Sequence, residues 1–169
     1  MDIQIKNLSV SFPSPKGDAK VLRNADIILK SGKITAIVGE SGSGKSILGA
    51  AVMGLLESSV RVSGEILFGN TDLLSLSEKE LNSIRGERIG WIAQDPVTAM
   101  DPMMKVGKQM MEGVHFYQNG KETKADGIRQ LEEFGLSDAQ RVWDAYPFGL
   151  SGGMAQRVLT AMMTLPGPE

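Results

Sequence analysis

Cysteine is absent from this chain, and histidine occurs once, at position 115. Without thiols the sequence excludes a disulfide framework and thiolate metal sites, and a single imidazole excludes a metal site built from several histidines. The absence of cysteine is compatible with a reducing cytosol but does not prove that location. We interpret His115 as a surface or partly buried structural residue.

Long apolar runs and an excess of one charge are missing too. No stretch reaches the roughly 18–20 apolar residues of a spanning helix, and the start, Met1-Asp2-Ile3-Gln4, lacks the basic and apolar regions of a signal peptide. The formal net charge is −2, with signs alternating along the chain, so no basic field indicates nucleic acid. We expect no nucleic-acid partner, and any membrane role to come through a membrane partner.

The patterns that are present place strands first and helices later. Alternation and β-branched runs predict strands at residues 3–12 (with a break near Asn7), 25–29, 34–38, 62–68 and 89–93. Spacings of three and four predict helices near 45–56, 105–117, 123–134, 138–145 and 154–164, and Ser77 with Glu80 predicts a capping box. This order fits an α/β nucleotide-binding core with a helical subdomain.

The strongest motif is the segment Gly39, Glu40, Ser41, Gly42, Ser43, Gly44, Lys45, Ser46, which fits G-x-x-x-x-G-K-[ST]. Glycines let several backbone N–H groups point at one anion, and the following helix adds its positive end. We expect Lys45 to pair with the β- and γ-phosphates and the Ser46 hydroxyl to bind Mg²⁺. The motif predicts a site for a nucleoside triphosphate, ATP with Mg²⁺, the alternative being a flexible glycine loop.

A second motif reads Leu150, Ser151, Gly152, Gly153, Met154, Ala155, Gln156, Arg157. Alone, Ser-Gly-Gly before a helix is only an N-cap and a loose anion nest. Together with the phosphate loop and Gln94 between them, it resembles the nucleotide-binding domain of ATP-binding cassette (ABC) proteins. Residues 38–46, 53–56, 94–96, 101–102 and 146–148 most resemble the ATPase subunits of dipeptide, oligopeptide and nickel importers.

The resemblance implies a P-loop NTPase fold of the ABC type over the whole chain. Its strand-rich part would span residues 1–94, its helical subdomain 95–150 and its signature helix 151–169. Gln94 and Lys45 would be catalytic, Gln94 touching Mg²⁺ and the attacking water. The signature residues Ser151, Gly152, Gly153 and Gln156 would reach the γ-phosphate across a dimer interface, and Phe12 would stack on adenine. The alternatives are a polar residue at a strand end for Gln94 and a core residue for Phe12.

The same resemblance implies partners. A second ATP-binding subunit, identical or different, would complete each site, and membrane-spanning permease subunits would be driven, at the cytoplasmic face of the plasma (inner) membrane. The methionines at 100, 103, 104, 110 and 111 lie where the family docks a cytoplasmic helix of the membrane subunit. Core filling is the competing interpretation, because methionine adapts to irregular gaps.

The acidic catalytic strand of the family, which ends in Asp-Glu, is not found in the sequence. Residues 91–95 are interrupted by Gln94 and followed by proline, and residues 142–144 are too few. We therefore expect the C-terminal part of the core to be missing, as in a fragment or a truncated gene product, and the chain to be marginally stable, prone to associate, and inactive or weakly active alone.

Two other function classes compete with an importer ATPase. A non-catalytic nucleotide-binding or dimerisation module would act by association, and the absent Asp-Glu favours it. A DNA-repair or chromosome-maintenance ATPase shares both glycine motifs but inserts a long coiled coil, whereas residues 95–149 carry no sustained heptads. The cargo, peptide or nickel, is not readable from an ATPase subunit.

Overall fold

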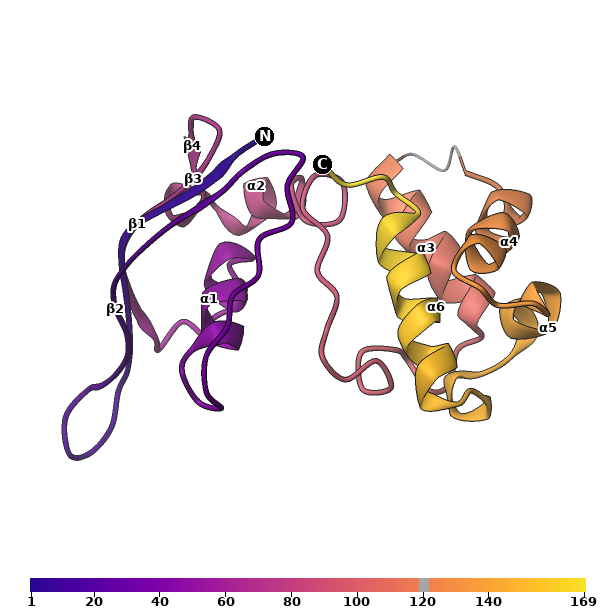
Figure 1. Cartoon of the computed structure of the whole chain (residues 1–169), viewed down its shortest axis with the longest axis horizontal. Helices are drawn as coiled ribbons and strands as arrows, with labels where there is room; N and C mark the ends of the chain where they lie inside the picture. Colours follow the sequence, from indigo (N-terminus) through magenta and orange to yellow (C-terminus); the bar gives the residue numbers. More distant parts are fainter. Residues whose placement is uncertain (119–121) are drawn as a thin grey trace. The chain divides into compact units, whose positions relative to one another are not determined.

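The computed structural model describes residues 1–118 and 122–169, which divide into two compact units, Met1–Asn82 and Ser83–Glu169. The first unit holds an antiparallel sheet with a helix packed beside it, and the second is built from helices (Figure 1). The expected subdomain division after Gln94 stays a prediction. Among the described residues no helix is long and apolar enough to cross a membrane.

The sheet of the first unit has the strand order β2-β1-β3-β4. Its strands are β1 (Ile3–Phe12), β2 (Ala19–Leu29), β3 (Arg61–Phe68) and β4 (Thr71–Asp72), each antiparallel to its neighbours. β1 lies in the centre, where Ile5 pairs with Ile27 on one side and Ile66 on the other. The expected strands at 3–12 and 62–68 are confirmed, and β2 is longer than the expected 25–29.

The break predicted near Asn7 is confirmed as a bulge. Asn7 adopts a left-handed φ of 47°, and the register of β1 shifts against both neighbouring strands there. The Asp26 carboxylate accepts the freed Asn7 N–H at 2.8 Å. On β3, a Cβ at Gly64 would lie 2.7 Å from the carbonyl oxygens of Lys6 and Asn7. The bulge therefore requires glycine on the neighbouring strand.

Two predicted strands are wrong. Residues 34–38 carry no strand pairing, and the side chains of Ile34 and Val38 are 102% and 90% exposed. Residues 89–93 form only one isolated bridge, between Arg85 and Ile89. A run of β-branched residues is typical of a buried strand. A strand also needs a neighbouring strand to complete its ladder of hydrogen bonds. No other strand among the described residues pairs with either segment.

The exposed apolar side chains of Ile34 and Val38 should promote self-association, because unpaired apolar backbone segments template pairing with another chain. We expect Val38→Lys to lower the association measured by concentration-dependent sedimentation without lowering the unfolding temperature. Val10→Lys, at a fully buried position, is the contrasting control, since it should unfold the sheet. A wild-type chain that sediments as a monomer and unfolds cooperatively would contradict this expectation.

The helices lie within a few residues of their expected positions. They are α1 (Lys45–Val52), α2 (Glu78–Asn82), α3 (Val106–Gln118), α4 (Lys124–Glu133), α5 (Ala139–Asp144) and α6 (Gly152–Thr164), with 3₁₀ turns at Leu73–Ser75 and Pro147–Gly149. α1 is shorter than predicted because Gly54 reverses the chain at a φ of 61°. α6 begins two residues earlier than predicted, directly after Ser151.

The core of the second unit forms where α3, α4, α5 and α6 meet, and Trp143 of α5 is its largest side chain. A Cβ at Gly107 of α3 would lie 2.1 Å from Trp143 Cε2, and one at Gly127 of α4 would lie 2.3 Å from its Cζ3. The Lys124 ammonium lies 5.9 Å from the ring centroid. Two glycines on different helices thus make the space for one indole, which no local sequence pattern reveals.

A capping box starts α4. Thr123 accepts the Asp126 N–H, and the Asp126 carboxylate accepts the Thr123 N–H at 2.8 Å. The hydrogen bonds from the Thr123 hydroxyl and backbone, followed by Arg129, hold the pKa of Asp126 below its ordinary value of 3.8. The expected box at Ser77 and Glu80 is also confirmed.

Because the pKa of Asp126 is depressed in the folded chain, its contribution to stability is complete above the unfolded pKa and is lost as pH falls through the folded value. We therefore expect Asp126→Asn to lower the unfolding temperature at about pH 7, and the difference from wild type to shrink as the pH falls below the unfolded aspartate pKa of about 3.9. Thermal unfolding above and below that pKa measures this. Glu132→Gln, at an exposed position on the same helix, should show no such convergence; equal differences at both pH values would contradict the assignment.

Candidate functional site

The loop formed by residues 39–46 precedes α1 and is almost entirely exposed. Gly42 and Gly44 hold left-handed φ values of 80° and 92°, which side chains rarely adopt. Gly44 is the N-cap of α1 and offers no side-chain cap. The first N–H groups of the helix are thus left without a capping side chain, at the positive end of its dipole. This arrangement suits an anion such as phosphate.

Lys45 folds back over the loop. Its ammonium donates to the carbonyl oxygens of Gly39 at 2.8 Å and Glu40 at 2.6 Å, and to the Ser43 hydroxyl at 3.2 Å. Ser43 N–H in turn donates to the Glu40 carbonyl at 3.2 Å. The cation is therefore held at the centre of the turn by neutral dipoles, with no carboxylate paired to it among the described residues, and it keeps its charge available to an incoming anion.

The loop rests on β2. A Cβ at Gly44 would lie 2.7 Å from the Leu22 side chain and 3.4 Å from Val21, and Gly44 is buried although its neighbours are not. At the start of the loop, a Cβ at Gly39 would lie 2.7 Å from the Ser43 hydroxyl. Gly44 thus combines a left-handed φ with a close approach to the neighbouring strand, whereas at Gly39 the close neighbour is the end of the Ser43 side chain. Sequence reasoning missed the contact between Gly44 and the strand because it began that strand at residue 25.

Phe12 stands at the end of β1 and is half-buried. It pairs with Ala19, and Val10, two residues earlier on the same strand, pairs with Leu22. Because Leu22 contacts the Gly44 position, the hairpin end that carries Phe12 adjoins the loop. The structure therefore brings Phe12, β2 and the loop together in one unit. The stacking of Phe12 on adenine remains a prediction.

A divalent cation at this site would take few ligands from the protein. The Ser46 side chain is exposed at the first turn of α1, and the described residues contain no group of three or more His, Asp or Glu side chains that could hold a metal ion. Mg²⁺ keeps several waters and is commonly bound through substrate phosphates together with one or two protein oxygens. A single hydroxyl beside an anion cradle fits that mode of binding.

Gln94 lies in the second unit, at a bend, with its side chain exposed. Directly after it, the Asp95 carboxylate accepts the N–H groups of Val97 at 3.0 Å and Thr98 at 3.4 Å, which closes a turn. The expected strand before Gln94 is not formed. Gln94 and the signature residues belong to one unit and Lys45 and Phe12 to the other, so the structure gathers the predicted site residues into two groups.

The signature segment forms the start of α6. The Ser151 hydroxyl accepts the Met154 N–H at 3.3 Å, and Ser151, Gly152, Gly153 and Gln156 are all exposed. Further along α6, Ala155, Val158 and Leu159 are buried in the core of the unit. The helix is therefore anchored by its apolar face while its first turn is presented to solvent. The N-cap interpretation is confirmed; contact with a γ-phosphate remains a prediction.

Core filling is confirmed for two of the methionines, and docking of a membrane-subunit helix remains a prediction. Met100 and Met110 are 3% and 1% exposed in the core, whereas the Met103 side chain is 83% exposed. Gln109, which sequence reasoning did not single out, fixes the loop that carries Met103: it exchanges hydrogen bonds with the Asp101 backbone and donates to the Met104 carbonyl at 2.8 Å. Its position one turn into α3 was the only available signal.

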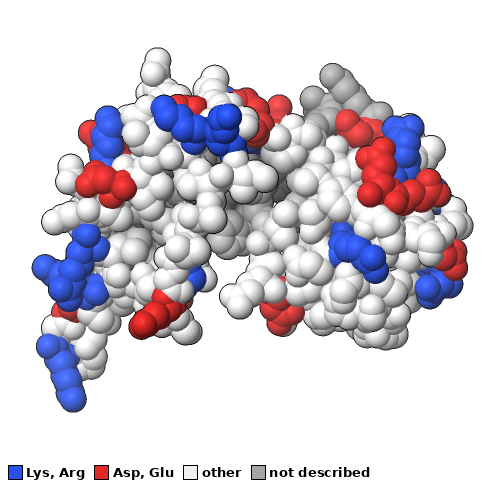
Figure 2. Space-filling model, viewed as in Figure 1, with Lys and Arg blue, Asp and Glu red and all other residues white. Residues whose placement is uncertain are grey.

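The surface charge agrees with the small net charge. Basic side chains gather at the tip of the β1–β2 hairpin, and elsewhere on the visible face basic and acidic side chains are interspersed (Figure 2). Asp18, the last residue of the loop that joins β1 to β2, is paired with Arg61 of β3. The visible face offers no broad field of one sign that would attract a nucleic-acid backbone.

Comparison with known proteins places these features in context. The family model described as ABC transporter matches residues 22–169. The chain is 39% identical over 169 residues to the oligopeptide transport ATP-binding protein OppD of Escherichia coli strain K12, covering 99% of this chain and 50% of OppD. It is 40% identical over 172 residues to the dipeptide transport ATP-binding protein DppD of Lactococcus lactis subsp. cremoris, covering 99% and 49%.

Solved structures give the same result. A structure described as the dimeric structure of MJ0796, a bacterial ABC transporter cassette, matches with a TM-score of 0.86 and 25% identity, covering 98% of this chain and 70% of that one. The same cassette in a post-hydrolysis state, bound to ADP and Pi, matches equally well. The chain spans about half the length of the curated relatives it matches.

Proposed function

Since the chain belongs to the ABC transporter family, with a P-loop NTPase fold, we propose that it is the ATP-binding part of a peptide-import ATPase that holds ATP–Mg²⁺ at residues 39–46. The observation that carries this proposal is the Lys45 ammonium, which is centred in an exposed loop at an uncapped helix N-terminus and paired with no carboxylate among the described residues. ATP hydrolysis is the general activity of the ABC ATPase family.

The named relatives support the import of peptides. They are oligopeptide and dipeptide transport ATP-binding proteins, and their similarity extends over nearly all of this chain. Nickel remains a second cargo class within the same proposal, and an ATPase subunit does not contact the cargo. The proposal for Phe12, Gln94 and the signature residues follows the same similarity: Phe12 against the base, Gln94 near Mg²⁺ and water, and residues 151–153 with Gln156 toward the phosphate of a second subunit.

The proposed partners are a second ATP-binding subunit and membrane-spanning permease subunits, at the cytoplasmic face of the plasma membrane. A dimeric cassette among the structural relatives supports the first, and the transport names of the relatives support the second. The exposed first turn of α6 leaves residues 151–153 accessible to another subunit, as a shared site requires.

A non-catalytic nucleotide-binding module is the second candidate, because the exposed loop with Lys45 at an uncapped helix N-terminus is sufficient to hold a phosphate group without hydrolysing it. Phosphate release from ATP–Mg²⁺ by the purified chain decides between the two, with Lys45→Ala as the blank. Release above the blank supports the ATPase. Nucleotide binding with release equal to the blank supports the module. A chain that binds no ATP–Mg²⁺ and is indifferent to Lys45→Ala would refute both.

A further inference from the structure

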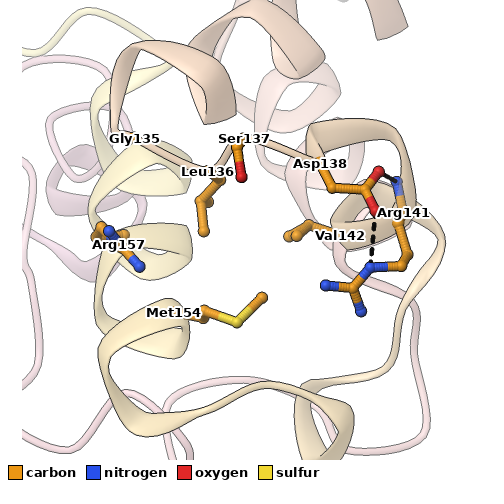
Figure 3. Close-up of a pocket in the computed structure, with 8 residues that line it drawn as sticks. All are labelled: Gly135, Leu136, Ser137, Asp138, Arg141, Val142, Met154 and Arg157. Atoms are coloured by element: carbon orange, nitrogen blue, oxygen red, sulfur yellow. Dashed lines mark hydrogen bonds and ion pairs between the residues drawn. The ribbon is translucent and has the colours of Figure 1, made fainter.

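A cavity of about 130 Å³ lies within the second unit, beside the first two turns of α6, and its lining does not include Ser151, Gly152, Gly153 or Gln156. Residues 135–138, which join α4 to α5, form one wall, and Arg141 and Val142 of α5 form another. Met154 and Arg157 of α6 close it (Figure 3). None of the nucleotide-site residues lines this cavity.

The cavity has an apolar floor and a charged rim. The side chains of Leu136, Val142 and Met154 converge on its centre (Figure 3), and the first two are 3% and 1% exposed. Both guanidinium groups, of Arg141 and Arg157, come from exposed residues. A ligand that fits must therefore combine a short apolar stem with a polar end.

The charges at the rim are unequal. Arg141 Nε donates to the Asp138 carboxylate at 2.9 Å, so that pair is neutral. Arg157 has no ion pair or hydrogen bond within the described ranges. Its Nη1 lies 3.7 Å from the position of a Cβ on Gly135, which at a φ of +77° carries no side chain to cover it. The cavity thus retains one positive charge with a planar pair of donors, a group suited to a carboxylate.

The volume of the cavity indicates whether that carboxylate belongs to a small molecule or to a protein side chain. Sites for small molecules usually enclose roughly 300–1,000 Å³, so about 130 Å³ holds a single side chain and not a metabolite. We propose that this cavity binds a glutamate side chain presented by a partner polypeptide, with its methylene groups on Leu136 and Met154 and its carboxylate on Arg157. Met154 and Arg157 lie on the first two turns of α6, so the same contact would fix the helix that carries residues 151–153.

A purely structural role for Arg157 has to be separated from binding. The guanidinium lies beside the C-terminal end of α4, where a cation is favourable to the helix dipole. Arg157→Lys keeps that cation but removes the two-pronged donor geometry. Arg157→Lys should therefore preserve the unfolding temperature and lose ligand binding. If the role of Arg157 were only structural, Arg157→Gln would lower the unfolding temperature and leave ligand binding unchanged.

The test is a titration of the ¹⁵N-labelled full chain with the peptide acetyl-Ala-Glu-Ala-amide, followed by NMR at the Arg157 Nε–Hε signal and the amides of residues 135–138. We expect saturable shifts in the millimolar range, at least tenfold weaker binding of acetyl-Ala-Gln-Ala-amide, and loss of the shifts at residues 135–138 in Arg157→Lys. Arg129→Lys, at an exposed position of α4 where the arginine is paired with Asp126, should bind as wild type does.

Three results would overturn the proposal: equal binding of the glutamate and glutamine peptides, persistence of the shifts in Arg157→Lys, or binding of inorganic phosphate as tight as that of the glutamate peptide, which would make the cavity a small-anion site. ATP binding measured on the same samples separates this outcome from a failure of the proposed function, because Arg157→Lys leaves residues 39–46 unchanged.

Discussion

Replacing Lys45 by alanine should weaken the binding of ATP–Mg²⁺ by about 100-fold or more. A hydrogen bond to a charged group contributes about 1.5–3 kcal/mol, and two bonds from the ammonium to the β- and γ-phosphates therefore contribute at least about 3 kcal/mol, which is about two decades in Kd. The ammonium is already desolvated in part by the carbonyl oxygens of Gly39 and Glu40. Isothermal titration of the purified chain measures the effect.

The matched control is Lys33→Ala, which removes an exposed lysine from the segment that leads to the loop. Lys33→Ala should bind ATP–Mg²⁺ within about twofold of wild type, since Lys33 lies outside residues 39–46 and charges on exposed side chains are screened by salt. Because Lys45 also holds the loop carbonyls, circular dichroism should establish that Lys45→Ala keeps the sheet and α1. An intact variant with wild-type affinity would show that residues 39–46 are not the phosphate site.

Gly107→Ala should destabilise the second unit by about 3 kcal/mol or more. A Cβ there would lie 2.1 Å from Trp143 Cε2, and overpacking a filled core commonly costs about 1–3 kcal/mol when the neighbour can move. The indole has little freedom to move, because the Cβ position of Gly127 on another helix lies at a similarly short distance from Cζ3 of the same ring. Such a loss is a large share of the roughly 5–15 kcal/mol that keeps a domain folded.

Chemical denaturation monitored by tryptophan fluorescence checks this prediction. Gly113→Ala on the same helix is the control, because a Cβ at Gly113 meets nothing within 4 Å; it should be neutral or more stable by up to about 1 kcal/mol. In a Trp143→Leu background the cost of Gly107→Ala should fall sharply, since the clashing ring is gone. Equal stabilities of Gly107→Ala and Gly113→Ala would contradict the packing described.

Local chemistry explains what could be predicted from the sequence. The turn that leads into α1 was readable because its glycines stand at fixed spacing before Lys45. The break at Asn7 was readable because a shift of apolar parity marks a bulge. Ser151 was readable as an N-cap for the same reason: the hydroxyl acts on a backbone group three residues away.

The features that were missed depend on partners distant in sequence. Residues 34–38 have the composition of a buried strand, yet composition does not supply the neighbouring strand that would bury them. Trp143 receives its space from Gly107 and Gly127, which lie 36 and 16 residues earlier in the sequence. Arg157 of α6 brings its Nη1 to 3.7 Å from the Cβ position of Gly135, which lies 22 residues earlier in the sequence.

The contact between Gly44 and Leu22 has a thermodynamic consequence. Because the loop rests on β2, a nucleotide that holds the loop selects chains in which the hairpin is also formed. By linkage, a ligand present at 100 times its Kd adds about 2.7 kcal/mol to the free energy of unfolding of the part of the chain that must be folded to bind it. Here that part includes the loop and the β1–β2 hairpin. Amide hydrogen exchange in β1 and β2 should therefore slow on addition of ATP–Mg²⁺, so that the strands report occupancy of a loop to which they do not belong.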